Sequence, residues 1–365
     1  MGEYRAFVYE GTEAKSITTH PCRLRAEGVD LKVNAGARTY PGGEMRSGRR
    51  VFAMVATVAF CSLLGGCSAS GGGAELCEES ANSRLMIDPT NRPIAFTSDR
   101  SGSFDLWLMD SDGSDSTRLT ASDNDEVMPS WSPDGTQVAF ASAVNQESPS
   151  DICVINSDGS GLKNLTQTAD VAELAPSWSP DGEQIVYGLW TDGADRIHII
   201  DSDGGESRML AGNGQWPSWS PDGERILFSR DRGPSGPELW TMKRDGSGQK
   251  ALTDSDAEPT EPSWSPDGSA IAFVAASGDA DASDPVKWNE DIFVIPAGGG
   301  TARRMTTSAG NDHWPPAWSP DGEQLVYTAD GTENVGRIVL IDLNTREITS
   351  LTDGSAHDMF PAWRR

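Results

Sequence analysis

The sequence predicts an all-β fold, a six-bladed β-propeller of four-stranded antiparallel blades, and three observations support this prediction. First, the segment "PSWSPDGTQVAF" at 129–140 recurs in four close copies, at 176–187, 217–228, 262–273 and 316–327. Second, a tryptophan recurs with it every 41 to 54 residues. Third, each interval contains short apolar, β-rich runs separated by turn residues. A repeat of this length is typical of propellers and solenoids. The repeated tryptophans are Trp131, Trp178, Trp219, Trp264, Trp318 and Trp363.

The first unit shows how one repeat forms four strands. Apolar runs at 94–98 and 105–110 are followed by a short polar run at 117–120 and by "PSWS" at 129–132. The "SPDG" that follows has Pro and Gly where a type I turn favours them, so the chain reverses there into the next strand. The tryptophan before the turn offers a large flat surface for packing against the neighbouring unit.

The two ends of the repeat array are out of phase, which predicts how the ring closes. The run at 94–98 has no tryptophan strand before it, and "PAW" at 361–363 has no apolar strand after it. Each end thus lacks the strand that the other end supplies, and an open solenoid gives no reason for the two ends to complement each other. We therefore expect the C-terminal strand to complete the blade that begins near Pro93, so that 92–365 forms a closed propeller.

The N-terminal part of the chain has the pattern of a lipoprotein signal. Arg46, Arg49 and Arg50 precede an apolar run at 51–64 that is short for a membrane span but typical of a signal peptide. The run ends in "LGGC" at 64–67, which resembles a bacterial lipobox and implies lipid attachment at Cys67 followed by cleavage before it. We expect a signal peptide at 45–66 and a lipidated, Gly-rich flexible tether at 67–91.

Two further expectations concern this region. Because a signal peptide acts from the very N-terminus, we expect translation to start at Met45 and 1–44 to be a mis-annotated N-terminal extension. The arginine pair leaves both Sec and twin-arginine export open. Of the remaining cysteines, Cys153 lies in an apolar strand and is expected to be a buried free thiol, with a Cys77–Cys153 disulfide as the alternative.

The charge of the chain limits its partners. A formal net charge of −26 argues against nucleic acid and against binding to an anionic membrane surface other than through a lipid anchor. Basic partners, metal ions and neutral ligands remain compatible with it. The "GGG" segments at 71–73 and 298–300 open no helix, and no nucleophile elbow or paired-cysteine motif is present.

At these residues the chain resembles the TolB-like propeller repeat, whose pattern joins "PxWSPDG", "IAF", "DIW", "DG" and "LT". The resemblance covers 92–365 and implies the propeller fold. It does not fix a function, because the pattern occurs in the periplasmic Tol–Pal protein, in peptidases and in sugar lyases. We expect neither the extra N-terminal domain of the first nor the C-terminal hydrolase domain of the second.

The loops that cross from one unit into the next tryptophan strand should meet at the mouth of the central channel. Their acidic and aromatic side chains suit a basic or peptide-like segment, or a sugar stacked on an indole ring. The alternative is that they are solvated loop residues. The candidate binding residues are Glu126, Glu173, Trp216, Glu258, Glu261, His313, Trp314, His357, Asp358 and Phe360.

Three functions fit these features. The first is a monomeric, non-enzymatic, extracytoplasmic module that binds a protein or peptide and needs no cofactor. The second is a metal-dependent polysaccharide lyase of the oligogalacturonate type, in which His313, His357 and Asp358 hold a divalent metal. The third is a carbohydrate-binding receptor of the cell envelope. The repeated "PSWSPDG" itself is expected to build blades and to carry no catalytic residue.

Overall fold

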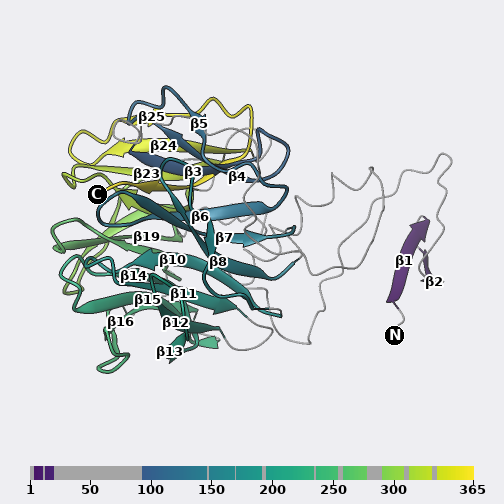
Figure 1. Ribbon diagram of the computed structural model, residues 1–365, viewed down its shortest axis with the longest axis horizontal. Coiled ribbons are helices and arrows are strands. Elements are labelled where there is room, and N and C mark those ends of the chain that lie inside the picture. The colour runs from purple at the N-terminus through teal and green to yellow at the C-terminus, as the bar shows by residue number, and fades with distance from the viewer. Residues whose placement is uncertain are drawn as a thin grey trace. The chain divides into compact units, whose positions relative to one another are not determined.

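The computed structural model describes residues 4–10, 13–19 and 93–365, apart from 146–147, 169, 191–194, 234–235, 254–257, 278–289, 308–311 and 331–334 (Figure 1). The signal peptide, Cys67 and the tether expected from the sequence lie outside these residues. The chain divides into two units, Met1–Met45 and Arg46–Arg365. In the first unit, β1 (Tyr4–Glu10) pairs antiparallel with β2 (Glu13–Thr19).

The described residues of the second unit form six antiparallel four-stranded sheets, which confirms the predicted six-bladed β-propeller. From its inner to its outer strand, blade 1 contains β26 (Asp358–Trp363), β3 (Ile94–Ser98), β4 (Asp105–Met109) and β5 (Thr117–Arg118). In the same order, blade 2 contains β6 (Asp125–Trp131), β7 (Gln137–Ala143), β8 (Ser150–Asn156) and β9 (Lys163–Asn164). Blade 3 contains β10 (Ala172–Trp178), β11 (Gln184–Trp190), β12 (Arg196–Asp201) and β13 (Arg208–Gly212).

The other three blades follow the same order. Blade 4 contains β14 (Gly214–Trp219), β15 (Arg225–Asp231), β16 (Pro237–Lys243) and β17 (Lys250–Ala251). Blade 5 contains β18 (Thr260–Trp264), β19 (Ala270–Ala276), β20 (Glu290–Pro296) and β21 (Arg303–Arg304). Blade 6 contains β22 (Asp312–Trp318), β23 (Gln324–Asp330), β24 (Gly336–Asp342) and β25 (Ile348–Ser350). Each tryptophan strand contacts the tryptophan strands of both neighbouring blades, so these six strands surround the central channel.

The C-terminal strand closes the ring as the sequence predicts. β26 pairs antiparallel with β3, with Trp363 opposite Ile94 and Asp358 opposite Ser98. The backbone N–H of Arg364 also donates to the carbonyl of Pro93 at 2.7 Å. Blade 1 is therefore assembled from residues at opposite ends of the propeller sequence.

The "SPDG" turns explain why this segment is repeated. In blade 2, the Gly135 N–H donates to the Ser132 carbonyl at 2.9 Å, which closes the turn. The Ser132 hydroxyl donates to Asp134 at 2.7 Å and accepts the Gln137 N–H at 2.9 Å. The same pattern recurs in blades 3 to 6. The inner edge of each of these blades therefore ends in a turn held by its own side chains.

The core consists of apolar layers between adjacent blades. Trp131 of blade 2, for example, packs in one buried cluster with Leu106 and Leu108 of blade 1. Cys153 belongs to the same cluster, and it is disulfide-bonded, so the expectation of a free thiol was wrong. Its partner lies outside the described residues. The disulfide alternative for Cys153 is thus the correct one, and its pairing with Cys77 stays a prediction.

One close approach between blades leads to a stability prediction. Gly113, in the β4–β5 turn of blade 1, has φ +86°, and a Cβ there would lie 2.9 Å from Cα of Leu351 in blade 6. Gly102 also has a positive φ, +106°, but open space surrounds it. We expect Gly113→Ala to cost about 2 kcal/mol more unfolding free energy than Gly102→Ala, because only the former adds overpacking to backbone strain. Urea denaturation of both variants measures this difference, and equal losses would contradict the interface.

Candidate binding site in the central channel

Every inner strand contains a β-bulge at the same place. The strand register shifts just before the tryptophan in all six blades, which re-aims the side chains there. In five blades the residue before the proline of "PxW" adopts a positive φ of 52–58°. In β22 that position is Pro315, whose ring fixes φ, and the left-handed residue is instead Trp314. At these bulges the residues with positive φ are Met128, Ala175, Trp216, Glu261, Trp314 and Phe360.

Four large apolar side chains at the bulges gather in the channel together with Trp190, the last residue of β11. Met128, Trp190, Trp216, Trp314 and Phe360 come from five different blades and form one buried cluster, each at most 8% exposed. The Trp190 and Trp216 rings meet edge to face at 5.4 Å, and the Trp314 and Phe360 rings lie 4.5 Å apart. We call these five residues the channel plug. It fills the channel at the level of the bulges.

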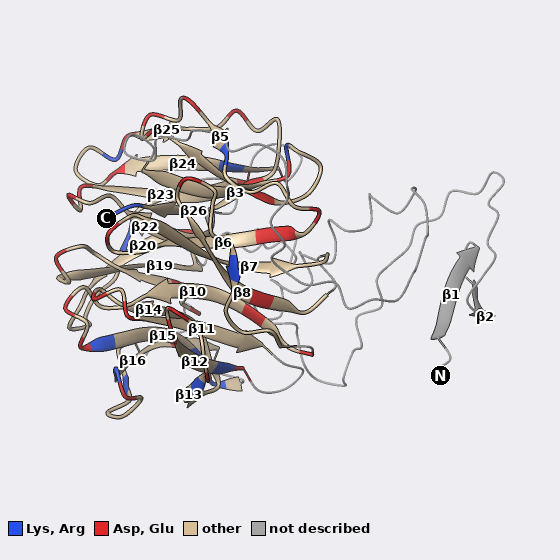
Figure 2. Ribbon diagram, in the orientation of Figure 1, with Lys and Arg blue, Asp and Glu red and all other residues tan. Residues whose placement is uncertain are grey.

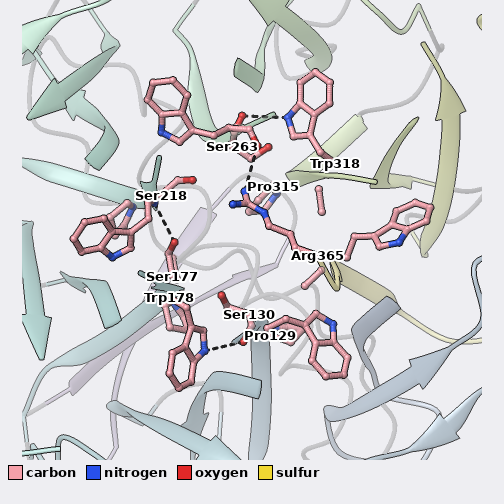
Figure 3. A pocket seen from close by; sticks show the side chains of 18 of the residues that line it. Pro129, Ser130, Ser177, Trp178, Ser218, Ser263, Pro315, Trp318 and Arg365 are labelled. Carbon is pink, nitrogen blue, oxygen red and sulfur yellow. Dashed lines mark hydrogen bonds between the residues drawn. The ribbon is translucent and has the colours of Figure 1, made fainter. Parts of the chain in front are cut away.

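A pocket of about 390 Å³ occupies the channel between the plug and the "SPDG" turns (Figure 3). Its floor includes Met128, Trp216 and Phe360 of the plug, and its outer rim includes the turn prolines. The walls repeat a proline and a small residue from each blade. These wall residues are Pro129, Ser130, Pro176, Ser177, Pro217, Ser218, Pro262, Ser263, Pro316, Ala317, Pro361 and Ala362.

Hydrogen bonds between blades fix these walls. Nε1 of Trp178 donates to the Ser130 carbonyl at 3.1 Å, and Nε1 of Trp318 donates to the Ser263 carbonyl at 3.2 Å. The Ser177 hydroxyl accepts the Trp219 N–H at 3.2 Å. Each of these contacts joins two adjacent blades, so the ring itself holds the walls of the pocket in place.

Arg365 brings a positive charge into this pocket. Its side chain leaves blade 1 and reaches blade 5, where Nη2 donates to the Trp264 carbonyl at 3.3 Å (Figure 3). Arg365 as a whole is exposed, but the surrounding channel walls partly desolvate its guanidinium and lower the pKa of that group. Among the described lining residues, Arg365 and Glu261 are the only ones with a titratable side chain. The pocket is thus mostly apolar, with one donor group that can meet an acceptor on a ligand.

An acidic rim surrounds the pocket. The aspartates of the five "PDG" turns are exposed, and the hydroxyl of the preceding serine lowers the pKa of each, in the case of Asp267 to about 2. In Figure 2, acidic residues recur along the side of the ring that also carries the C-terminus. These carboxylates are Asp134, Asp181, Asp222, Asp267 and Asp321. They stay ionised at neutral pH and favour a basic partner around an apolar centre.

The structure places three of the predicted acidic residues inside the protein. Glu126, Glu173 and Asp358 lie five residues before their tryptophans and are at most 1% exposed. Burial raises the pKa of Glu126 and of Glu173 to about 7. Asp358 is ion-paired with Arg100 at 2.7 Å.

The other predicted residues that the structure describes lie in the plug, beside the pocket or at the ends of crossover loops. Trp216, Trp314 and Phe360 belong to the plug, and Glu261 borders the pocket. Glu258 and His357 are half-buried at the ends of crossover loops, and Asp99 accepts the His357 N–H at 2.9 Å. The side chain of His313 lies outside the described residues. Within the described part of the chain, no group of three or more His, Cys, Asp or Glu side chains could hold a metal ion.

The proline and serine walls are functional candidates that sequence reasoning misses. Their only signal in the sequence is the repeat itself, which local reasoning attributes to blade construction alone. Six copies of "PxW" on six inner strands also imply six equivalent side chains around one axis. That symmetry is the feature that predicts a lined pocket on the turn side.

These features define the class of protein: a closed six-bladed β-propeller with a pocket in its channel. The family model described as "TolB beta propeller domain" matches residues 77–216 and 169–287, which together are more than half of the chain. The chain therefore belongs to the TolB β-propeller family. No functionally curated protein matches it. In the described residues, no helix has the length and apolar character needed to cross a membrane.

Solved structures with a similar fold include TolB proteins and a lyase. TolB from Acinetobacter baumannii is 20% identical, with a TM-score of 0.64 over 76% of this chain and 68% of that one. A putative TolB from Agrobacterium tumefaciens is 20% identical, with a TM-score of 0.56 over 75% and 91%. An oligogalacturonate lyase from Vibrio parahaemolyticus is 15% identical, with a TM-score of 0.50 over 77% and 79%. At these identities the likeness shows the fold alone.

Proposed function

We propose that this chain is a lipid-anchored, extracytoplasmic, non-enzymatic module that binds a protein segment in the turn-side pocket of its propeller. The proposal rests mainly on one observation, the composition of the pocket and its rim. The pocket has a proline, serine and tryptophan lining with a single cationic group, Arg365, inside an acidic rim. An extended segment with an apolar or acceptor-bearing centre and basic flanks complements this surface.

Two features support an extracytoplasmic location. The "LGGC" segment ending at Cys67 has the pattern of a lipobox, and Cys153 is disulfide-bonded. Disulfides persist in oxidising compartments and are rare in the cytosol of mesophiles. Family membership is consistent with this location, since TolB-like propellers include periplasmic proteins.

The two alternative functions gain no specific support. Trp216 and Trp314 are 4% and 8% exposed, so neither offers an open ring face on which a sugar could stack. Asp358, a predicted metal ligand of the lyase alternative, is already paired with Arg100. We therefore retain protein binding as the proposal.

Peptides selected for binding to the chain from a phage-displayed library test this proposal. We expect Arg365→Ala, and Ser218→Trp, which fills the pocket, to weaken the selected peptides about tenfold or more. The matched control is Arg208→Ala, because Arg208 is exposed on β13, the outer strand of blade 3, and is absent from the pocket lining. Fluorescence anisotropy gives the affinities. Peptides that bind all variants equally would refute binding in this pocket.

A further inference from the structure

In blades 1 and 5 a buried acid of the third strand pairs with an arginine of the fourth strand, and blade 2 keeps the acid without the arginine. In blade 1, Arg118 of β5 pairs with the buried Asp105 of β4 at 2.7 Å. In blade 5, Arg304 pairs with the buried Asp291 at 2.6 Å. The equivalent pair in blade 2 is Asp151 and Asn164, whose amide donates to the carboxylate at 2.8 Å. Blade 2 thus keeps the buried acid but lacks the arginine.

A second acid lies at the same place. Glu173, at the start of the next inner strand, is 1% exposed, and no donor meets full hydrogen-bond geometry at either of its carboxylate oxygens, although the hydroxyls of Thr166 and Thr168 lie near them. Burial, and then the nearby carboxylate of Asp151, raise the pKa of Glu173. Among the described residues, no Lys or Arg forms an ion pair with either acid. Two buried carboxylates without a counter-charge are costly unless a cation or a proton compensates them.

Neutral oxygens complete the surroundings of these two acids. The hydroxyls of Thr166 and Thr168 lie near the Glu173 carboxylate, where they oppose the rise of its pKa. Tyr187 is 1% exposed, its hydroxyl has no hydrogen-bond partner, and both acids raise its pKa, although burial is the larger cause. The equivalent residue of blade 2 is Phe140, which has no oxygen.

The equivalent interface between blades 1 and 2 has both a counter-charge and a hydrogen-bond donor for its glutamate. There Arg118 supplies the positive charge, and the Ser122 hydroxyl donates to Glu126 at 2.6 Å. The interface of blades 2 and 3 therefore combines carboxylate, hydroxyl and phenol oxygens in place of the arginine. Oxygen ligands of this kind suit hard divalent cations, Ca²⁺ above all.

We propose that Asp151 and Glu173 form a calcium site between blades 2 and 3, with oxygens of Tyr187, Thr166 and Thr168 as further ligands. The cation takes the place that arginine holds in blades 1 and 5. With two carboxylates, the site belongs with weak extracellular calcium modules, whose dissociation constants are about 10⁻⁴–10⁻³ M. It lies away from the channel pocket and does not depend on the proposed function.

Thermal unfolding of the purified chain at pH 7.5, with chelator or with about 5 mM Ca²⁺, tests the site. We expect Ca²⁺ to raise the midpoint by roughly 2–4 °C. Glu173→Gln should abolish this shift because it removes one of the two charges. Asn164→Arg should also abolish it, because the arginine restores the pair found in blades 1 and 5, and it should stabilise the chelator-treated chain.

Two controls keep the result specific. Glu126→Gln, at the equivalent position of an interface that already has an arginine, should keep the calcium shift. Isothermal titration with Ca²⁺ should show one site per chain that is lost in the Glu173 and Asn164 variants. An unchanged wild-type midpoint, or a shift of equal size in all variants, would overturn the proposal and assign the charge compensation to a proton on Glu173.

Discussion

Removal of residues 358–365 is expected to unfold the propeller or to lower its thermal midpoint by more than about 10 °C. The deletion takes away β26, the inner strand of blade 1, and exposes the paired edge of β3 with its buried Ile94 and Phe96. It also removes Phe360 from the plug. Loss of one buried Phe costs about 3–5 kcal/mol, and each kcal/mol shifts the midpoint of a domain of 150–250 residues by about 2–4 °C.

A shorter deletion separates closure from an effect of the terminus. Removing Arg364 and Arg365 alone leaves β26 intact and should lower the midpoint by only a few degrees. Circular dichroism and calorimetry measure both variants. If the longer deletion melted like the shorter one, β26 would not close the ring.

Stability is expected to fall as the pH rises from about 5 to 8, with Glu126 and Glu173 as the cause. The folded-state pKa of each is about 7, above the ordinary value of 4.5, because burial penalises the charged form. Each therefore contributes stability that is full below pH 4.5 and is lost as the pH rises through 7. At 1.36 kcal/mol per pKa unit, the loss is up to about 3 kcal/mol for each residue.

Glutamine variants identify the groups responsible for this pH dependence. With chelator present, Glu126→Gln and Glu173→Gln should each flatten the pH profile and be more stable than the parent chain at pH 8. His198 acts in the opposite sense, since burial lowers its pKa, so the difference between variant and parent is the informative quantity. Glu224→Gln, at an exposed position, is the control. Equal slopes in urea denaturation at pH 5 to 8 would show that neither glutamate titrates in this range.

Much of the fold could be predicted from the sequence because turns and apolar runs are local signals. "SPDG" requires a reversal wherever it occurs, and the unmatched ends, Ile94 and Trp363, have one economical pairing. The Cys153 disulfide was less predictable, because a buried cysteine in an apolar strand has the same local pattern whether free or bonded.

The channel was harder to predict, because its shape depends on backbone geometry rather than on residue type. The left-handed residues at the bulges turn Trp216 and Phe360 inward and bury them in the plug. Glu126 and Glu173 occur in polar, loop-like sequence, yet strand pairing carries them between blades. Sequence polarity indicated exposure for these two residues, and tertiary packing buries both.

Photo-crosslinking in intact cells shows directly whether the turn-side pocket binds a protein. A benzoylphenylalanine at position 218 reports on the pocket wall, and one at position 170 reports on the exposed crossover loop of the opposite face. We expect a discrete crosslinked protein from position 218, lost on addition of Arg365→Ala, and none from position 170. Crosslinking from position 170 alone would place the binding surface on the opposite face and refute binding in the pocket.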